Sequence, residues 1–396
     1  MSRVYVIGTC DTKQDELSFA KAEVLRAGAD ALLVDVSTRG SGNADVSATE
    51  VAAFHPNGTQ AVTGLDDRGH AVTAMAEALM RFLLSREDVA GVLGLGGSGN
   101  TAMVTQAMRA LPIGVPKLMV STVASGNVAA YVGPSDIAMM YSVVDVAGLN
   151  AISRKVIGNA AHAIAGMART GVEAMAGDKP AAGLTMFGVT TDCVSQIREL
   201  IGQTHECFVF HATGTGGQSM EKLVESGLIT SVIDITTTEV ADFLCGGTLA
   251  CTADRFGAVI RTRVPYVGSV GAVDMVNFGA RETVPEKFGG RHFHIHNPQV
   301  TLMRTTPDEN HAIGEWIVAR LNRMMGPVRF LLPLRGVSAI DAEGKPFHDA
   351  AADAALFGAI RRGWLAAANR RLIEMDAHIN DAAFAAECVR HYNEII

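Results

Sequence analysis

Short apolar runs alternate along the first half of this chain with longer segments whose apolar residues follow helical spacing. The apolar runs of strand length cover residues 4–7, 31–34, 89–93 and 117–120. Helical spacing is found between them, for example in residues 16–27 and 72–85. Such alternation is typical of parallel sheets that are covered by helices on both faces. The sequence therefore predicts an α/β fold with a doubly wound, mainly parallel sheet.

A similar order of elements begins again in the second half. Residues 183–192 read as a strand that ends in a Gly/Thr/Asp turn, as residues 4–12 do, and residues 171–182 have the composition of a linker. We expect two Rossmann-like subdomains, over residues 1–176 and 183–396. A ligand cleft is expected between them, outside the carboxyl ends of the strands.

The composition agrees with this fold and narrows the function. Hydrophobic residues make up 48% of the 396 residues, 41 residues are glycine, and the net charge is −8. Nucleic-acid binding depends on clustered Lys and Arg, which this sequence lacks, so we expect no nucleic-acid partner. No apolar run reaches transmembrane length, and the six cysteines form no CxxC pair. We expect a cytoplasmic protein with reduced thiols that binds no membrane.

A glycine-rich turn follows the third apolar run. Residues 91–101, GVLGLGGSGNT, read as a strand that enters a turn and then a helix. Glycines let successive backbone N–H groups converge on an anion, and the helix directs the positive end of its dipole at the same point. The turn is neither a Walker motif nor a dinucleotide fingerprint, and a tight turn without a ligand is the alternative. The candidates for phosphate contacts are Gly96, Gly97, Ser98, Gly99, Asn100 and Thr101.

Polar residues also follow the other predicted strands of the first half. Asp35, at the end of the second strand, is a candidate for accepting a ribose hydroxyl. Lys13 can neutralise phosphate charge, and Asp11 can hold a metal or cap a helix. The candidates after the first strand are Gly8, Thr9, Asp11, Thr12 and Lys13. Those after the fourth strand are Ser125, Gly126 and Asn127, for which a helix cap is the alternative.

The second half has a glycine turn of its own, which we expect to contact the ligand as well. Its residues are Thr213, Gly214, Thr215, Gly216 and Gly217. Asp274, Arg255 and Arg304 are charged residues in apolar surroundings, so they form either a buried salt-bridge network or a site for an acidic substrate. The glycine-rich stretch 241–300 is expected to form functional loops.

Three alternating histidines, His292, His294 and His296, would project from one face of a strand. Such an arrangement is compatible with a transition metal, but proteins that bind ATP favour Mg²⁺ on oxygen ligands. We expect no metal site at these histidines. Ser338, Asp341 and His378 have the residue types of a catalytic triad without the nucleophile elbow, and we set this interpretation aside.

Several ordered blocks together resemble one known family. They are GTCDTK (8–13), GLGGSGNT (94–101), STVASGN (121–127), GAVDMVNFG (271–279), HNP (296–298), TLMRTT (301–306), GVSAID (336–341) and HIND (378–381). The whole chain is similar to the Tm-one-like ATP-binding family. The resemblance implies two Rossmann-like subdomains, ATP binding and a homodimer. In a plant relative a TIM-barrel domain follows this region, so the resemblance also implies a separately encoded TIM-barrel partner.

The resemblance does not supply a reaction. We expect an ATP-dependent enzyme that uses ATP and Mg²⁺ on a small carboxylated metabolite, with Lys13, Asp274 and Arg304 as the catalytic residues. One alternative is a nucleotide-gated binding protein without turnover. The other is a lyase or isomerase that acts on a sugar acid without a nucleotide.

Overall fold

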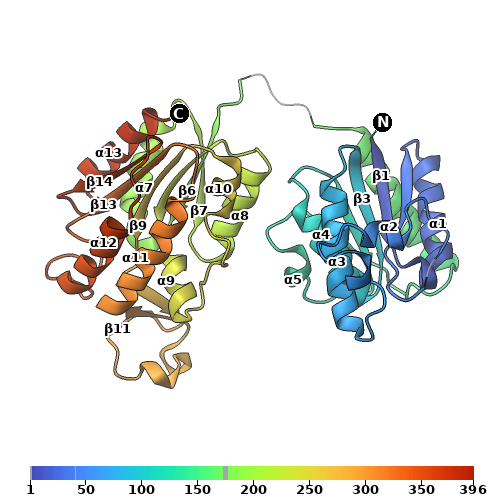
Figure 1. Ribbon diagram of the computed structural model, residues 1–396, viewed down its shortest axis with the longest axis horizontal. Helices are drawn as coiled ribbons and strands as arrows, with labels where there is room; N and C mark the ends of the chain where they lie inside the picture. Colours follow the sequence, from blue (N-terminus) through green and yellow to red (C-terminus); the bar gives the residue numbers. More distant parts are fainter. Residues whose placement is uncertain (1, 41, 173–176) are drawn as a thin grey trace. The chain divides into compact units, whose positions relative to one another are not determined.

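The computed structural model describes residues 2–40, 42–172 and 177–396. The chain divides into two compact units, Met1–Ala174 and Met175–Ile396. Each unit has its own parallel sheet with helices on both faces (Figure 1).

The sheet of the N-terminal unit has five strands in the order β2-β1-β3-β4-β5, and every neighbouring pair is parallel. The strands are β1 (Arg3–Gly8), β2 (Ala31–Asp35), β3 (Val89–Gly96), β4 (Lys117–Ser121) and β5 (Ala138–Tyr141). The helices are α1 (Cys10–Arg26), α2 (Ala48–Ala52), α3 (Arg68–Leu84), α4 (Ser98–Ala110), α5 (Ala129–Val132) and α6 (Ala151–Arg169), with a 3-10 turn at Thr59–Ala61.

Successive residues of β1 bury on opposite faces of this sheet, because strand side chains alternate with a period of two. Tyr5 and Ile7 join a core with α2, α3 and α4. Val4 and Val6 join a second core with α1 and α6. Two apolar faces explain why the strand reads as an unbroken apolar run and why helices are needed on both sides.

The C-terminal unit contains a parallel sheet of six strands in the order β14-β13-β9-β8-β6-β7. Its strands are β6 (Ala181–Met186), β7 (Glu206–His211), β8 (Ser231–Thr236), β9 (Tyr266–Gly271), β13 (Val328–Pro333) and β14 (Arg370–Met375). A small antiparallel sheet in the order β10-β12-β11 is formed by β10 (Met275–Phe278), β11 (Phe293–Asn297) and β12 (Val300–Arg304).

Helices cover both faces of the six-stranded sheet (Figure 1). On one face lie α7 (Thr191–Ile201) and α13 (Ala382–Asn393). On the other face lie α8 (Thr215–Glu225), α9 (Thr238–Cys245), α10 (Gly257–Thr262), α11 (Pro307–Leu321) and α12 (Ala350–Gly363). Short 3-10 turns occur at Gly188–Thr190, Arg281–Thr283 and Glu286–Phe288.

The predicted fold class is confirmed, since both units are α/β with parallel sheets between helices. Of the predicted linker 171–182, residues 173–176 lie outside the described part, and β6 already begins at Ala181. Among the described residues, no helix is both long and apolar enough to cross a membrane. The predicted ligand cleft between the halves stays a prediction.

The stretch 241–300 differs from the expectation of functional loops. It contains β9, a fully buried strand inside the main sheet, and two strands of the small antiparallel sheet. Its glycines allow close packing: a Cβ on Gly268 would lie 2.5 Å from the Tyr266 ring, and one on Gly271 would lie 2.5 Å from the Ile235 carbonyl oxygen. Gly268 and Gly271 therefore mark tight contacts within the sheet, whereas Gly246 and Gly290 have open space around them.

Gly94 offers a test of how closely α4 packs on β3. A Cβ at this position would lie 2.5 Å from Met119 Sδ and 2.8 Å from Val104 Cγ1. Gly94→Val is therefore expected to lower the free energy of unfolding of the N-terminal unit by about 1–3 kcal/mol through overpacking. Urea unfolding followed by far-UV circular dichroism measures the change.

Gly97→Ala is the matched control, because its Cβ would find no atom closer than 3.7 Å and its φ is −81°. This variant should unfold like the parent chain. Equal stability of both variants would contradict the close packing of α4 on β3.

Candidate functional site

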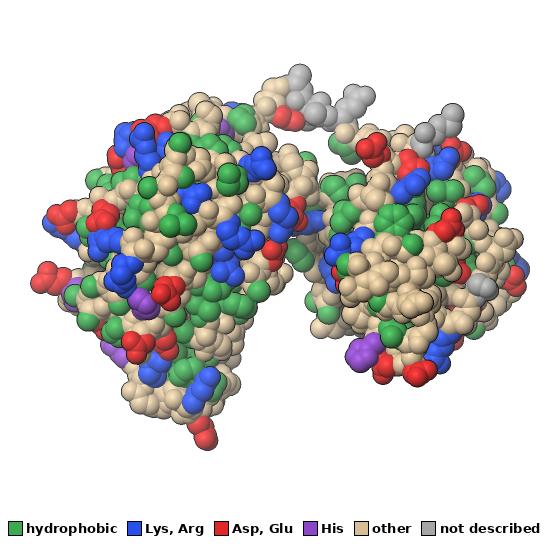
Figure 2. Space-filling model, in the orientation of Figure 1, with side chains coloured by type: hydrophobic (Ala, Val, Ile, Leu, Met, Phe, Trp, Pro, Cys, Tyr) green, Lys and Arg blue, Asp and Glu red, His purple; other side chains and the backbone are tan. Residues whose placement is uncertain are grey.

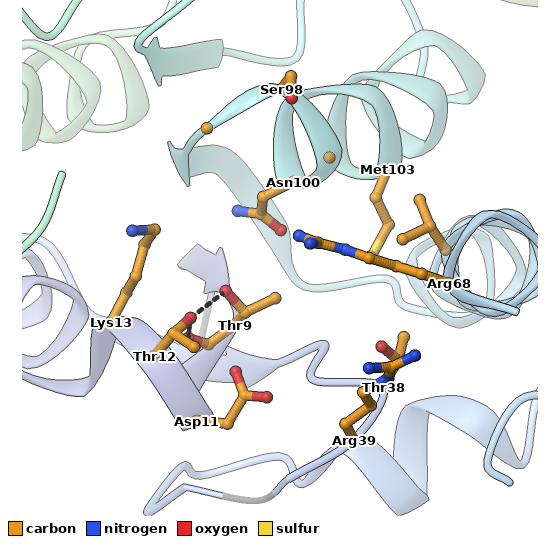
Figure 3. Close-up of a pocket in the computed structure, with 13 residues that line it drawn as sticks. Thr9, Asp11, Thr12, Lys13, Thr38, Arg39, Arg68, Ser98, Asn100 and Met103 are labelled. Atoms are coloured by element: carbon orange, nitrogen blue, oxygen red, sulfur yellow. Dashed lines mark hydrogen bonds between the residues drawn. The ribbon is translucent and has the colours of Figure 1, made fainter. Parts of the chain in front are cut away.

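A pocket of about 470 Å³ opens in the N-terminal unit (Figure 3). It is lined by Thr9, Asp11, Thr12, Lys13, Thr38, Arg39, Arg68, Val72, Gly97, Ser98, Gly99, Asn100 and Met103. Most of these residues come from the β1–α1 and β3–α4 connections together with the first turns of α1 and α4. The chain places β2 on one side of β1 and β3 on the other, so the order of strands reverses between β1 and β3. Ligands of open α/β sheets bind at such a switch point, at the carboxyl ends of the strands.

The glycine turn between β3 and α4 forms one side of this pocket. Gly96 has a φ of +152°, and a Cβ there would lie 2.8 Å from Asn100 Cβ, so the turn requires glycine. Gly97 is the N-cap of α4, and no described side chain forms a capping hydrogen bond with the first turn of this helix. The first backbone N–H groups of α4 are thus left for a ligand.

Two side chains that follow the turn have different surroundings. Thr101 is fully buried, and its hydroxyl bonds Gly97 O at 2.8 Å and Ser121 Oγ at 2.6 Å, so it holds the turn in place and does not line the pocket. Asn100 is 7% exposed and donates through Nδ2 to Leu95 O. Its Oδ1 is buried and has no hydrogen-bond partner among the described residues.

The β1–α1 turn supplies the predicted cation and carboxylate. The hydroxyls of Thr9 and Thr12 lie 3.1 Å apart, and Asp11 stands beside them in Figure 3. Lys13 departs from helical geometry, with φ −138° and ψ 32°, and its ammonium donates to Val146 O. Gly8 does not line the pocket; a Cβ there would lie 2.7 Å from Leu17 Cδ2, so it permits packing of α1.

Two further predicted groups of this unit lie outside the pocket lining. Asp35 is 1% exposed, and its carboxylate accepts hydrogen bonds from Cys10 N, from Ser37 N and Oγ, and from Gly42 N. This position argues against the predicted ribose contact, because the carboxylate already organises the turns after β1 and β2. Ser125, Gly126 and Asn127 are exposed, and Asn127 Oδ1 accepts from Ala129 N at 3.0 Å, although the N-cap of α5 is Val128.

Thr38, Arg39 and Arg68 are pocket residues that sequence analysis missed. Thr38 and Arg39 follow β2, so their position after a predicted strand was a usable signal. Arg68 is the first residue of α3 and does not follow a predicted strand, so no local pattern distinguishes it.

The glycine turn of the C-terminal unit is closed by the protein's own carboxylate. The backbone N–H groups of Gly214 and Gly217 donate to Glu239 Oε1 at 2.7 and 3.1 Å. A Cβ on Gly217 would lie 2.3 Å from Glu239 Oε2, and one on Gly216 would lie 1.9 Å from His211 O. The prediction that Thr213, Gly214, Thr215, Gly216 and Gly217 contact the ligand is therefore not supported at the backbone amides of Gly214 and Gly217, which already bind an internal anion.

Arg255 holds this carboxylate within a buried network. Its guanidinium bonds Glu239 Oε2 at 2.9 Å, Glu221 Oε1 at 2.9 Å and both Asp234 carboxylate oxygens at 2.8 Å. All four side chains are buried, and burial raises the pKa of Glu221. Of the two interpretations of Arg255, the salt-bridge network is the one that the structure shows.

Asp274 and Arg304 also lie in a buried network. Arg304 is 5% exposed, and its guanidinium bonds Asp353 Oδ1 at 2.8 Å and Phe347 O at 2.7 Å. Asp274 Oδ2 accepts from Ser338 Oγ at 2.8 Å, and burial raises the Asp274 pKa to about 6. Arg304 therefore belongs to a salt-bridge network with Asp341 and Asp353. Asp274 is buried beside it without an ion pair, and its Oδ1 has no hydrogen-bond partner among the described residues. Lys13 belongs to the other unit.

The three histidines give no support to a metal site. His292 and His294 pack against the Phe347 ring, with centroids 5.3 and 6.2 Å apart, and His296 is exposed. Across the described ranges, no group of three or more His, Cys, Asp or Glu side chains is arranged to hold a metal ion.

Arg255→Met tests the buried network. The change leaves Glu239, Glu221 and Asp234 without their shared cation, and breaking a buried ion pair in this way costs about 3–5 kcal/mol of folding free energy. Urea unfolding followed by tryptophan fluorescence reports on the C-terminal unit, because the two tryptophans of the chain, Trp316 and Trp364, both lie there.

The matched control is Arg261→Met. The Arg261 side chain is 51% exposed and pairs with Glu225 and Asp254, so its loss should cost less than about 1 kcal/mol. Similar costs for both variants would show that the Arg255 network does not stabilise the unit.

Asp242→Asn tests a pH dependence of stability. Burial raises the pKa of Asp242 from 3.8 to about 7, so the folded state holds a proton that the unfolded state releases. The resulting stabilisation is full below the unfolded pKa and is lost as the pH rises through 7. Replacing Asp242 should remove this loss and change the slope of unfolding free energy against pH by up to about 1.4 kcal/mol per pH unit.

Urea unfolding between pH 5 and 8 measures this slope. Asp376→Asn is the control, since Arg335 lowers the pKa of that exposed carboxyl and its titration lies below this range. A slope that Asp242→Asn leaves unchanged would contradict a buried, protonated Asp242.

The sequence of each unit matches a known domain. Residues 2–173 match the N-terminal domain, and residues 179–396 the C-terminal domain, of the uncharacterised protein family UPF0261. A UPF0261 protein of Rhizobium meliloti is 57% identical over 396 residues, which cover 100% of this chain and 99% of the relative. One from Clostridium tetani is 42% identical over 392 residues, with 97% and 96% covered.

A tomato protein, the ToMV resistance protein Tm-1 of Solanum lycopersicum, is also similar. It is 43% identical over 422 residues, which cover 99% of this chain and 56% of the tomato protein. The domain matches and the similarity to the tomato protein agree with the resemblance seen in the sequence blocks. The chain belongs to the uncharacterised, Tm-1-like protein family UPF0261.

Proposed function

We propose that the N-terminal unit binds ATP with Mg²⁺ in the pocket at the carboxyl ends of β1 and β3. The observation that carries the proposal is the uncapped N-terminus of α4 in a pocket at the topological switch point. A helix N-terminus of this kind attracts phosphate through its free N–H groups and its dipole. The resemblance to an ATP-binding family supports the same ligand.

The charges around the pocket support an anionic ligand. Lys13, Arg39 and Arg68 line it together with a single carboxylate, that of Asp11. On the face that Figure 2 shows, Lys and Arg side chains are interspersed with Asp and Glu. The net charge of the chain is −8, so the excess of cations at this pocket is a local feature.

The residues of the β1–α1 turn fit Mg²⁺. This ion takes hard oxygen ligands and is usually held by one or two carboxylates together with substrate phosphates. Asp11 would supply the carboxylate, and Thr9 and Thr12 would supply hydroxyl oxygens. When bound, the ion would offset the repulsion between Asp11 and the phosphates.

The first candidate function for this site is an ATP-dependent enzyme that acts on a small carboxylated metabolite. Arg304 does not support its acceptor site, because its charge is paired with Asp341 and Asp353 inside the C-terminal unit, and Asp274 is fully buried. This pairing favours the second candidate, a nucleotide-gated binding protein. The homodimer and the TIM-barrel partner stay predictions.

Gly97→Val and Lys13→Ala test the ATP site. A Cβ on Gly97 meets no atom closer than 3.7 Å, so the fold should persist while the valine side chain blocks the phosphate position. Loss of the Lys13 charge should weaken binding of ATP with Mg²⁺ at least about tenfold, since hydrogen bonds to charged groups contribute about 1.5–3 kcal/mol. Isothermal titration calorimetry measures both affinities.

Gly126→Val is the control, since Gly126 lies in an exposed turn outside the pocket. It should bind ATP as the parent chain does. Unchanged affinity in both test variants would refute the site. Measuring phosphate release from ATP in the presence of small carboxylic acids distinguishes the two candidate functions. The enzyme should release phosphate, and the binding protein should release none.

A further inference from the structure

We infer that Arg68 and Arg39 form a second cationic group in the pocket, at the opposite end from Lys13, so that its ligand carries one anionic group for each end and a hydrogen-bond donor near Asn100. This inference rests on the proposed function, because it concerns the same pocket. In Figure 3, Lys13 lies at one end of the view, Arg68 and Arg39 lie at the other, and Asn100 lies between them.

Arg68 occupies a position that folding alone does not favour. It is the first residue of α3, where the positive end of the helix dipole repels a cation. Neighbouring Asp67 uses its carboxylate to cap the helix through His70 N at 2.7 Å. Within the described ranges, the Arg68 guanidinium has neither an ion pair nor a hydrogen bond, and an anionic ligand would supply both.

The Arg68 side chain reaches the glycine turn. Its Nη2 lies 4.0 Å from the position that a Cβ on Gly99 would take. Figure 3 shows the side chain extending from α3 toward α4. An anion bound between Arg68 and the first turn of α4 would therefore contact both the guanidinium and the backbone N–H groups.

Arg39 brings a second guanidinium to the same side. It lines the pocket and donates through Nη2 to Asp66 O at 3.0 Å, and no carboxylate of the described residues pairs with it. Its bond to Asp66 attaches the segment after β2 to the residues that precede Arg68. The two arginines therefore belong to one connected wall of the pocket.

Asn100 provides the independent observation that points to a ligand. Its side chain is more than nine-tenths buried, and Oδ1 accepts no hydrogen bond although the residue lines the pocket. Buried polar atoms are normally satisfied, so this acceptor calls for a donor from the ligand. A hydroxyl or amino group between the two anionic groups would supply it.

Two kinds of ligand share this chemistry. One is a polyphosphate chain with a hydroxyl-bearing group, as in a nucleoside triphosphate. The other is a small phosphorylated hydroxy acid, in which a phosphate and a carboxylate flank a hydroxyl. Three probes distinguish these cases. Orthophosphate offers one anionic group, tripolyphosphate represents the polyphosphate chain, and 3-phosphoglycerate represents the phosphorylated hydroxy acid.

The test compares Arg68→Met with Arg81→Met in the full chain by calorimetry with these three probes. Both changes remove one cation from α3, but Arg81 lies in the last turn, pairs with Glu77 and is outside the pocket. We expect the parent chain to bind one two-group probe at least about tenfold more tightly than orthophosphate. Arg68→Met should abolish this advantage, Arg81→Met should keep it, and Arg68→Lys should restore part of it.

A stability measurement separates binding from a structural role. Arg68→Met should melt at the same temperature as the parent chain or slightly higher, because the helix dipole no longer repels a cation. The inference is overturned if the two-group advantage is absent from the parent chain or survives in an Arg39→Met/Arg68→Met double variant. If the advantage depends on Arg68 but ATP with Mg²⁺ does not bind, the proposed function fails and the second anion site stands.

Discussion

The hydrogen bonds from Gly214 and Gly217 to the Glu239 carboxylate determine which glycine turn of this chain is open to a ligand. Both units place a glycine turn between a strand and a helix, and such turns direct backbone N–H groups at an anion. In the C-terminal unit that anion is part of the chain and is fixed by Arg255. In the N-terminal unit no described side chain caps α4, and a pocket opens at the turn.

The position of the open pocket follows from strand order. Since β1 lies between β2 and β3, the connections after β1 and β3 leave the sheet on opposite faces, toward α1 and α4. The space between these connections is where a ligand can reach backbone groups from both. The buried Asp35 carboxylate supports this geometry, because it ties the start of α1 to the segment after β2.

Much of the fold could be predicted from sequence because apolar periodicity and glycine turns are local signals. The same signals found Gly97–Asn100 and the turn from Thr9 to Lys13. They could not find Arg68, which reaches the pocket only through the packing of α3 against the sheet, or show that Glu239 fills the second turn. That contact joins residues 25 positions apart, so composition at the turn carries no trace of it.

The contrast between the turns limits where a ligand response can arise. An anion that belongs to the chain cannot exchange, and Glu239 is held by a guanidinium that also pairs with Glu221 and Asp234. A phosphate at these amides would leave the buried Glu239 Oε1 without its two backbone donors, and an unsatisfied buried acceptor costs about 1–3 kcal/mol or more for a charged group. The pocket of the N-terminal unit bears no such cost, since its cations at Arg39 and Arg68 pair with no described carboxylate. Of the two turns in the described residues, the N-terminal one is therefore the place for the exchangeable anion that we propose.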